Sequence, residues 1–313
     1  MKNHRFACAA LLAGFFLCTL SPSNAVAQNP AAPENPASAT LVVTAHGRGS
    51  HAVPQISQSD VTVLVNRRPA QITSWEAYRG ANDRLQLVFL FDESARSYLA
   101  LQFSSIRKFI DGLPPSAEVG IAYMSNGRAV FTQKLTSDHA LAGKGLRLPN
   151  GIPGISASPY FCLSDLAKNW PSHAQSRRVV FMVTNGEDPY YRGGDLQDPY
   201  VRSAISDSQK ARLVVYSIYF RNTGFNGRQL GVLYGQSYLL RVSDETGGVA
   251  YSEALSSPVS FDPFLKQFKT SLDNQYQLMI AAQGSGLQSV TVKSNMRGVK
   301  LKAATRVDLG SGQ

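Results

Sequence analysis

Three short segments of this chain carry oxygen-bearing side chains at positions where they could hold a divalent ion. Segment 92–96 reads Asp-Glu-Ser-Ala-Arg and follows the apolar run 85–91, and segment 184–188 reads Thr-Asn-Gly-Glu-Asp and follows the apolar run 179–183. Segment 156–159 reads Ser-Ala-Ser-Pro and opens a predicted helix. In an open α/β sheet the carboxyl ends of the strands meet at one edge, so we expect these segments to converge. Hard oxygen ligands from several loops are what Mg²⁺ requires.

The elements that would position these segments are predicted by their hydrophobic patterns. Nearly continuous apolar runs indicate strands buried on both faces of a parallel sheet, and they occupy 85–91, 179–183 and 213–220. Apolar residues at helical spacing predict helices over 99–113, 159–170, 199–211, 230–243 and 262–272. Further strands are predicted at 118–123, 129–135 and 249–252. This alternation predicts an α/β domain over 81–273 with a doubly wound, mostly parallel, Rossmann-like sheet.

Shorter strand patterns flank this domain on both sides. Before it, strands are predicted at 41–45, 61–65 and 71–75, and after it at 275–282, 289–293 and 298–303. We therefore expect segments 41–80 and 274–313, which are far apart in the sequence, to pair into one small β-domain.

The motif positions resemble those of the von Willebrand factor type A family, and most closely its secreted bacterial variety with flanking β-strands. The resemblance covers nearly the whole chain after the N-terminus. In this family an Asp-x-Ser-x-Ser segment, a Thr that opens a helix and a Thr-Asp-Gly turn form a metal-ion-dependent adhesion site. Asp92 and Ser94 match the first element, and Thr184 and Gly186 match the last. Ser158 takes the place of the helix-opening Thr. The resemblance implies a von Willebrand A-like fold and a role in recognition.

Two departures from the family motif predict a degenerate metal site. Arg96 stands where the second serine is expected, and Asn185 where the aspartate is expected. A guanidinium is a permanent cation and cannot ligate a metal. At ~4 Å, two unit charges near a protein surface interact by about 4 kcal/mol. We therefore predict that the site built from Asp92, Ser94, Ser158 and Asn185 is vacant and that the protein needs no cofactor.

The position of Arg96 leaves two alternatives open. If Arg96 points inward, it would pair with Asp92 or Glu187, and it could receive a carboxylate of a partner directly. If Arg96 points outward, the four oxygen-bearing residues could hold a weakly bound Mg²⁺.

Two loops beyond the carboxyl ends of the strands favour a binding surface. Segments 188–198 and 221–235 carry Tyr and Arg residues, which dominate interface hot spots. Together with Arg96 and Glu187, the predicted ligand-binding residues are Tyr190, Tyr191, Arg192, Phe225, Arg228 and Tyr234. We expect this rim to bind an extracytoplasmic protein with an acidic surface. The alternative is that these aromatic residues pack against the bases of their own loops.

Several functions are disfavoured because their motifs are absent. The sequence has no Gly-x-Ser-x-Gly elbow, no phosphate-binding loop and no His-Glu-x-x-His segment, so we expect a non-catalytic protein. The net charge is +10, but the basic residues are scattered, so nucleic-acid binding is not expected. The alternatives kept open are an adhesin or carbohydrate-binding module with weak Mg²⁺ binding, and a secreted hydrolase without a recognisable motif.

The N-terminus predicts export. Lys2 and Arg5 precede the apolar segment 6–20, and Ala25-Val26-Ala27 offers a cleavage site, so residues 1–27 are expected to be a signal peptide. Residues 28–40 contain three Pro residues and are expected to be a flexible leader. We predict a secreted or periplasmic monomer with no transmembrane segment after cleavage. Cleavage would leave Cys162 as a lone, buried cysteine without a disulfide.

Overall fold

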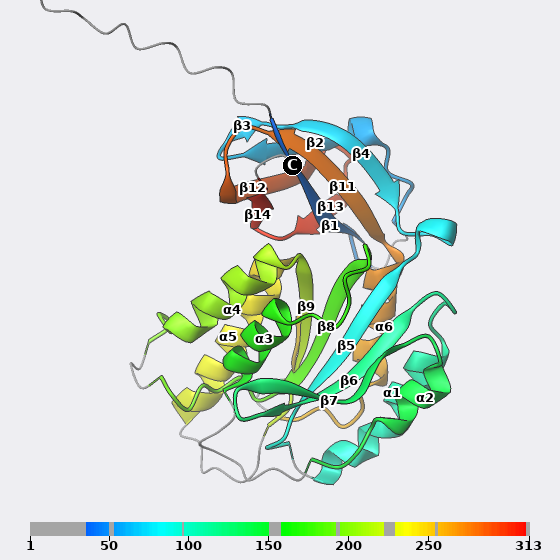
Figure 1. Ribbon diagram of the computed structural model, residues 1–313, viewed down its shortest axis with the longest axis vertical. Coiled ribbons are helices and arrows are strands. Elements are labelled where there is room, and N and C mark those ends of the chain that lie inside the picture. Colours follow the sequence, from blue (N-terminus) through cyan, green and yellow to red (C-terminus); the bar gives the residue numbers. More distant parts are fainter. Residues whose placement is uncertain are drawn as a thin grey trace, which may run out of the picture. The chain divides into compact units, whose positions relative to one another are not determined.

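A six-stranded sheet forms the centre of the α/β domain (Figure 1). The computed structural model describes residues 36–49, 53–95, 97–149, 158–191, 195–221, 229–253 and 256–310. The strand order is β10-β9-β8-β5-β6-β7, with β7 alone running antiparallel to its neighbour. The strands are β5 (Leu85–Asp92), β6 (Glu118–Ser125), β7 (Arg128–Thr136), β8 (Arg177–Thr184), β9 (Leu213–Tyr219) and β10 (Ala250–Tyr251).

Helices cover both faces of this sheet, which explains the nearly continuous apolar runs. All eight residues of β5 are buried. Leu87, Phe89 and Phe91 pack into one hydrophobic cluster, whereas Val88 and Leu90 pack into the other. The first cluster includes residues of α1 (Phe103–Asp111), α2 (His139–Lys144) and α6 (Asp262–Asp273). The second includes residues of α3 (Pro159–Lys168), α4 (Pro199–Lys210) and α5 (Gln229–Thr246). Successive side chains of a strand point to opposite faces, so a strand between two helix layers is apolar throughout.

Two four-stranded antiparallel sheets form the small β-domain. One has the order β13-β1-β11-β4 and the other β14-β12-β2-β3. The N-terminal strands are β1 (Ala37–Gly47), β2 (Val61–Val65), β3 (Arg68–Pro69) and β4 (Gln71–Ala77). The C-terminal strands are β11 (Gln275–Ala282), β12 (Gly286–Ser294), β13 (Val299–Ala303) and β14 (Arg306–Leu309). Short 3₁₀ turns occupy Gln58–Asp60, Gly80–Asn82 and Ser97–Gln102.

N-terminal and C-terminal strands pair directly with each other in both sheets. β11 lies between β1 and β4, and β12 pairs with β2. The predicted fold class, an α/β domain with a small β-domain made from both ends of the chain, is therefore confirmed. β1 begins at Ala37, inside the segment 28–40 that was expected to be a leader. That expectation is wrong for residues 37–40, because Ala37 to Thr40 pair with Ala282 to Met279 of β11.

Buried polar contacts connect the two sheet systems, and residues 35–313 form one compact unit. The guanidinium of Arg177, at the start of β8, pairs with Asp83 and donates to the Leu272 carbonyl (2.7 Å) and to Oε1 of Gln275 (2.8 Å). The Gln275 amide in turn donates to the Tyr216 hydroxyl (3.3 Å). No helix among the described residues is long and apolar enough to cross a bilayer. The predicted signal peptide lies outside the described residues.

Candidate functional site

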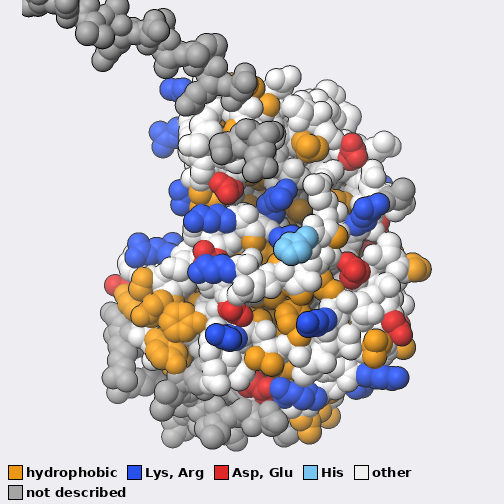
Figure 2. All heavy atoms as spheres, viewed as in Figure 1, with side chains coloured by type: hydrophobic (Ala, Val, Ile, Leu, Met, Phe, Trp, Pro, Cys, Tyr) orange, Lys and Arg blue, Asp and Glu red, His pale blue; other side chains and the backbone are white. Residues whose placement is uncertain are grey.

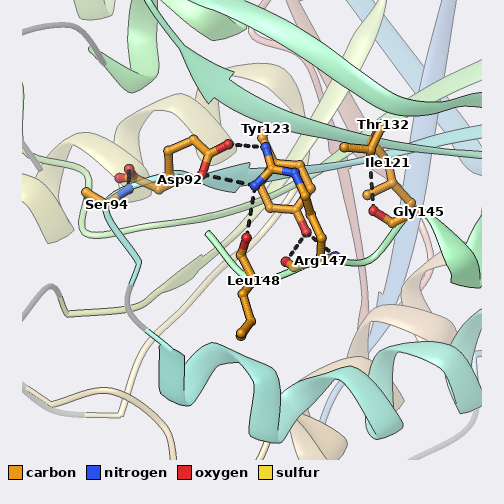
Figure 3. A network of polar contacts seen from close by, with 9 residues as sticks. Asp92, Ser94, Ile121, Tyr123, Thr132, Gly145, Arg147 and Leu148 are labelled. Atoms are coloured by element: carbon orange, nitrogen blue, oxygen red, sulfur yellow. Dashed lines mark hydrogen bonds and ion pairs between the residues drawn. The ribbon is translucent and has the colours of Figure 1, made fainter. Parts of the chain in front are cut away.

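Asp92 ends β5 with both carboxylate oxygens engaged. The residue is only 4% exposed. Its Oδ1 accepts the backbone N–H of Ser94 (2.8 Å), and its Oδ2 accepts the hydroxyl of Thr184 (2.7 Å). Figure 3 shows Asp92 beside Ser94 at the end of the strand. Burial raises the pKa of the Asp92 carboxyl, although these hydrogen bonds oppose the shift.

Ser158 caps α3, as its place before Pro159 predicts. Its Oγ accepts the backbone N–H groups of Tyr160 (3.3 Å) and Phe161 (3.4 Å). The same hydroxyl donates to Oδ2 of Asp188 (2.9 Å). Asp188 lies in the predicted segment 184–188 but was not among the predicted metal-binding or ligand-binding residues. Its position directly after the Thr-Asn-Gly turn, on the same rim, was the signal that could have found it.

The Thr184-Asn185-Gly186 turn is fixed by its own hydrogen bonds. Oδ1 of Asn185 accepts the backbone N–H of Glu187 (3.0 Å), and the Thr184 hydroxyl accepts that of Gly186 (3.1 Å). The hydroxyl of Tyr160, which is buried in α3, donates to the Gly186 carbonyl (2.6 Å). The structure thus brings Asp92 and Ser94 together with Thr184 by direct bonds, and Ser158 to the same turn through Asp188 and Tyr160.

Three of the four predicted metal ligands accept hydrogen bonds from other groups of the chain. The Asp92 carboxylate, the Ser158 hydroxyl and the Asn185 amide oxygen each accept at least one hydrogen bond at 2.7–3.4 Å. Among the described residues, no three His, Cys, Asp or Glu side chains are grouped so that they could hold a metal ion. The Ser158 hydroxyl already uses both of its lone pairs and its proton, so this donor set does not fit an open oxygen cage.

A guanidinium does lie close to this site, but it comes from another segment. Arg147, which follows α2, forms an ion pair with Glu93 and donates to the Leu148 carbonyl (2.9 Å). Its guanidinium carbon lies 4.0 Å from the centre of the Tyr123 ring, and Figure 3 shows this group of contacts. Arg96 lies outside the described residues, so its predicted pairing with Asp92 or Glu187 stays a prediction.

Carboxylates dominate the charges on the described part of the rim. Burial raises the pKa of Glu187; Asp92 adds to that shift and Arg221 opposes it. Burial also raises the pKa of Asp188, and Asp198 contributes in the same direction. Three arginines that suggested an acidic partner, Arg96, Arg192 and Arg228, fall outside the described residues.

The described aromatic residues of the rim divide into exposed and packed ones. Tyr190 is 45% exposed, and its ring lies 5.2 Å from that of Phe161. Tyr191 donates its hydroxyl to Oδ1 of Asp195 (2.7 Å). Tyr234 is partly buried in α5 and stacks on Tyr238 of the same helix. Phe225 lies outside the described residues.

The environment of Cys162 disfavours its reactive thiolate form. Cys162 is fully buried in α3, and burial raises the pKa of its thiol to about 12. It packs in the cluster between α3 and the sheet, as its apolar neighbours predicted.

The comparisons with known proteins yield structural similarity only. No protein-family profile and no curated protein matches the sequence. Among solved structures, a von Willebrand factor type A protein from Catenulispora acidiphila is 11% identical, with 88% of this chain and 74% of that chain covered and a TM-score of 0.44. An aerotolerance-related membrane protein from Bacteroides fragilis is 16% identical over 60% of this chain and 98% of its own, also with a TM-score of 0.44. BatB, a conserved hypothetical protein from Bacteroides thetaiotaomicron, is 13% identical over 60% and 97%, with a TM-score of 0.42.

The strand order, the helix layers and the position of Asp92 at the end of a central strand describe the architecture by themselves. The domain has a von Willebrand A-like fold. In such an open sheet, Asp92 and the Thr184 turn end the neighbouring strands β5 and β8, which is where ligands bind in α/β folds.

Proposed function

We propose that this chain is an exported, non-catalytic protein-recognition module of von Willebrand A type that works without a bound metal. The rim at the carboxyl ends of β5 and β8 is the proposed recognition surface. The observation that carries this proposal is the exposure of two large side chains: Tyr190 and Leu196 are each 45% exposed.

Hydrogen bonds hold the described residues beside each of these two side chains. Oδ1 of Asp188 accepts the backbone N–H of Tyr190 (2.8 Å). Further along, α5 holds the residues around Leu196, because the Tyr238 hydroxyl donates to the Asp195 carbonyl (2.7 Å) and Arg241 donates to the Leu196 carbonyl (3.1 Å). Backbone groups that are already hydrogen-bonded lose little entropy on binding, which favours recognition.

Metal independence is supported by the hydrogen bonding of the predicted ligands. A cation coordinated by Ser158 would have to displace the α3 backbone N–H groups, and one bound by Asp92 would compete with the Thr184 hydroxyl. We expect neither Mg²⁺ nor EDTA to change the thermal midpoint of the protein, because an ion that binds only the folded state would raise it. A rise on adding millimolar Mg²⁺ that Asp92→Ala abolishes would contradict this part of the proposal.

The charges and apolar side chains of the rim indicate which kind of partner surface it would bind. An acidic partner surface is supported only by the arginines that lie outside the described residues, whereas Glu187 and Asp188 lie within them. We therefore propose that aromatic and apolar contacts, centred on Tyr190 and Leu196, supply most of the affinity.

The experiment uses a double variant and a matched control. The full chain is immobilised and exposed to an extracytoplasmic extract of the source organism, and captured proteins are identified by mass spectrometry. Tyr190→Ala with Leu196→Ala should weaken capture at least about tenfold, which is the size of a hot-spot loss. Leu141→Ala, which removes an exposed leucine from α2 near the amino ends of the strands, should leave capture unchanged. Equal capture by all three proteins would rule out this rim.

A further inference from the structure

A cavity lies at the amino ends of the parallel strands, which is the end of the sheet opposite the rim. It has a volume of about 440 Å³ and is lined by residues at the amino ends of β8 and β9 and by residues of β1 and β11. Four arginines line it: Arg84, Arg177, Arg178 and Arg212. No Asp or Glu is among its lining residues. Figure 2 shows Lys and Arg side chains gathered across the middle of one face of the molecule.

Three of these arginines have no carboxylate partner in the described part of the chain. Arg178 donates from Nη2 to the Ser172 carbonyl (3.1 Å), and its guanidinium lies over the Trp170 ring. Burial lowers the pKa of Arg178, and the positive charge of Arg212 lowers it further. Arg212 directly precedes β9 and has a left-handed backbone conformation (φ 57°). Among the described residues, a carboxylate therefore pairs with only one of the four arginines, Arg177.

The fourth arginine adds a buried donor that lacks an acceptor. Arg177 is 4% exposed, and both of its Nη atoms have partners, which are Asp83, Leu272 and Gln275. Its Nε is buried and has no hydrogen-bond partner among the described residues. A buried donor without an acceptor is costly, so an acceptor from a bound ligand would be favourable.

We propose that this cavity binds a dianionic phosphate group, carried either by inorganic phosphate or by a small phosphate monoester. Guanidinium groups match phosphate oxygens with two parallel hydrogen bonds. Asp83 neutralises only one of the four guanidiniums, so a dianion compensates the remaining charge better than a single carboxylate does. Met279, which is 36% exposed, also lines the cavity and offers an apolar side chain to the organic part of an ester.

This site is independent of the rim, so the two proposals stand or fall separately. Isothermal titration calorimetry of the full chain at pH 8 would use inorganic phosphate, glycerol 3-phosphate and acetate as titrants. We expect saturable binding of at least one of the two phosphates and none of acetate at the same concentration. Arg178→Gln and Arg212→Gln should each weaken phosphate binding about tenfold or more, since each removes a charged hydrogen-bond donor.

The matched control is Arg297→Gln, an exposed arginine that does not line the cavity. It should leave the affinity unchanged and thereby separate a built site from general attraction to a basic protein. Three results would overturn the proposal: no heat with either phosphate, equal weakening in all three variants, or acetate binding as tightly as phosphate. Far-ultraviolet circular dichroism of each variant checks that the fold is retained.

Discussion

The carboxyl group of Asp92 sits where ionisation is unfavourable. Burial raises its pKa above the ordinary value, even though the Ser94 amide and the Thr184 hydroxyl stabilise the charged form. The folded state therefore binds a proton more tightly than the unfolded state does. By linkage, the contribution of Asp92 to stability falls as the pH rises from the ordinary aspartate pKa through the raised one. Above that window the destabilisation is fully present.

Replacing the carboxylate by an amide should remove this destabilisation. We expect Asp92→Asn to raise the free energy of unfolding at pH 8 by about 1 kcal/mol, the ordinary size of a single-residue effect. The gain should shrink as the pH falls toward 4, because the parent carboxyl then becomes neutral. Urea unfolding at pH 4, 6 and 8 measures it. Asp111→Asn, at the exposed end of α1, is the control for replacing a carboxylate outside the site. A variant less stable than the parent at every pH would show that Asp92 is needed as an anion.

Sequence alone located much of this site but not its cation. Asp92, Ser158 and Thr184 could be predicted together because each directly follows a buried strand or opens a helix, and such positions converge at one sheet edge. Arg147 could not be predicted, because its partner Glu93 is 54 residues away and no local motif joins them. Only the path of the chain after α2 brings that guanidinium onto Tyr123.

The contact between α5 and the β8–α4 turn depends on two facing glycines. Gly186 has φ 69°, and a Cβ on it would lie 2.4 Å from the Gly235 carbonyl oxygen. A Cβ on Gly235, in α5, would lie 2.2 Å from the Asn185 carbonyl oxygen. Because both clashes involve backbone atoms, neither can be relieved by turning a side chain. The turn therefore requires glycine at position 186.

A methyl group at Gly235 should therefore force α5 away from the turn. We expect Gly235→Ala to destabilise the protein by about 2 kcal/mol, within the range for overpacking, despite the better helix propensity of alanine. The matched control is Gly143→Ala in α2, where the new methyl would meet only the Arg107 side chain, at 3.4 Å. That change should stabilise the protein by about 0.5–1 kcal/mol. If chemical denaturation gives both variants the same sign, the close approach does not limit α5.

Strands that are buried on both faces could be predicted from the sequence. Elements whose conformation depends on long-range contacts could be predicted less well. β5, β8 and β9 match the predicted strands because strands covered on both faces are apolar throughout. The predicted helix 99–113 is instead a 3₁₀ turn at Ser97–Gln102 followed by α1. The Gln102 side chain donates to the Val259 carbonyl (3.0 Å) and accepts the Phe261 amide (2.9 Å), and these long-range bonds hold the irregular turn. The short strand β14 was not predicted, since it exists through its pairing with β12.

At the scale of the whole molecule, Arg177 connects segments that are distant in the sequence. It begins β8 of the α/β domain and reaches Gln275 at the start of β11, which is central in a sheet of the small β-domain. Its pairing with Asp83 also fixes the chain where it enters β5. Removing one partner of a buried ion pair lowers the free energy of unfolding by about 3–5 kcal/mol. Its position predicts that the two parts of the molecule unfold together.

The two tryptophans allow this cooperativity to be measured, because each reports one part. Trp75 stacks on Tyr276 in the small β-domain (4.6 Å between ring centres), whereas Trp170 donates to Oε1 of Gln86 in the α/β domain (2.8 Å). The single-tryptophan variants Trp75→Phe and Trp170→Phe should each show one fluorescence transition in urea. After correction for the cost of each substitution, measured by circular dichroism, the fluorescence and dichroism midpoints should coincide.

Arg177→Met in either background should lower the free energy of unfolding by about 3 kcal/mol or more. Arg178→Met, which removes the neighbouring arginine without breaking an ion pair among the described residues, should change it by less than about 1 kcal/mol. Separate transitions for the two tryptophans in the presence of Arg177 would show that the small β-domain and the α/β domain are independent folding units.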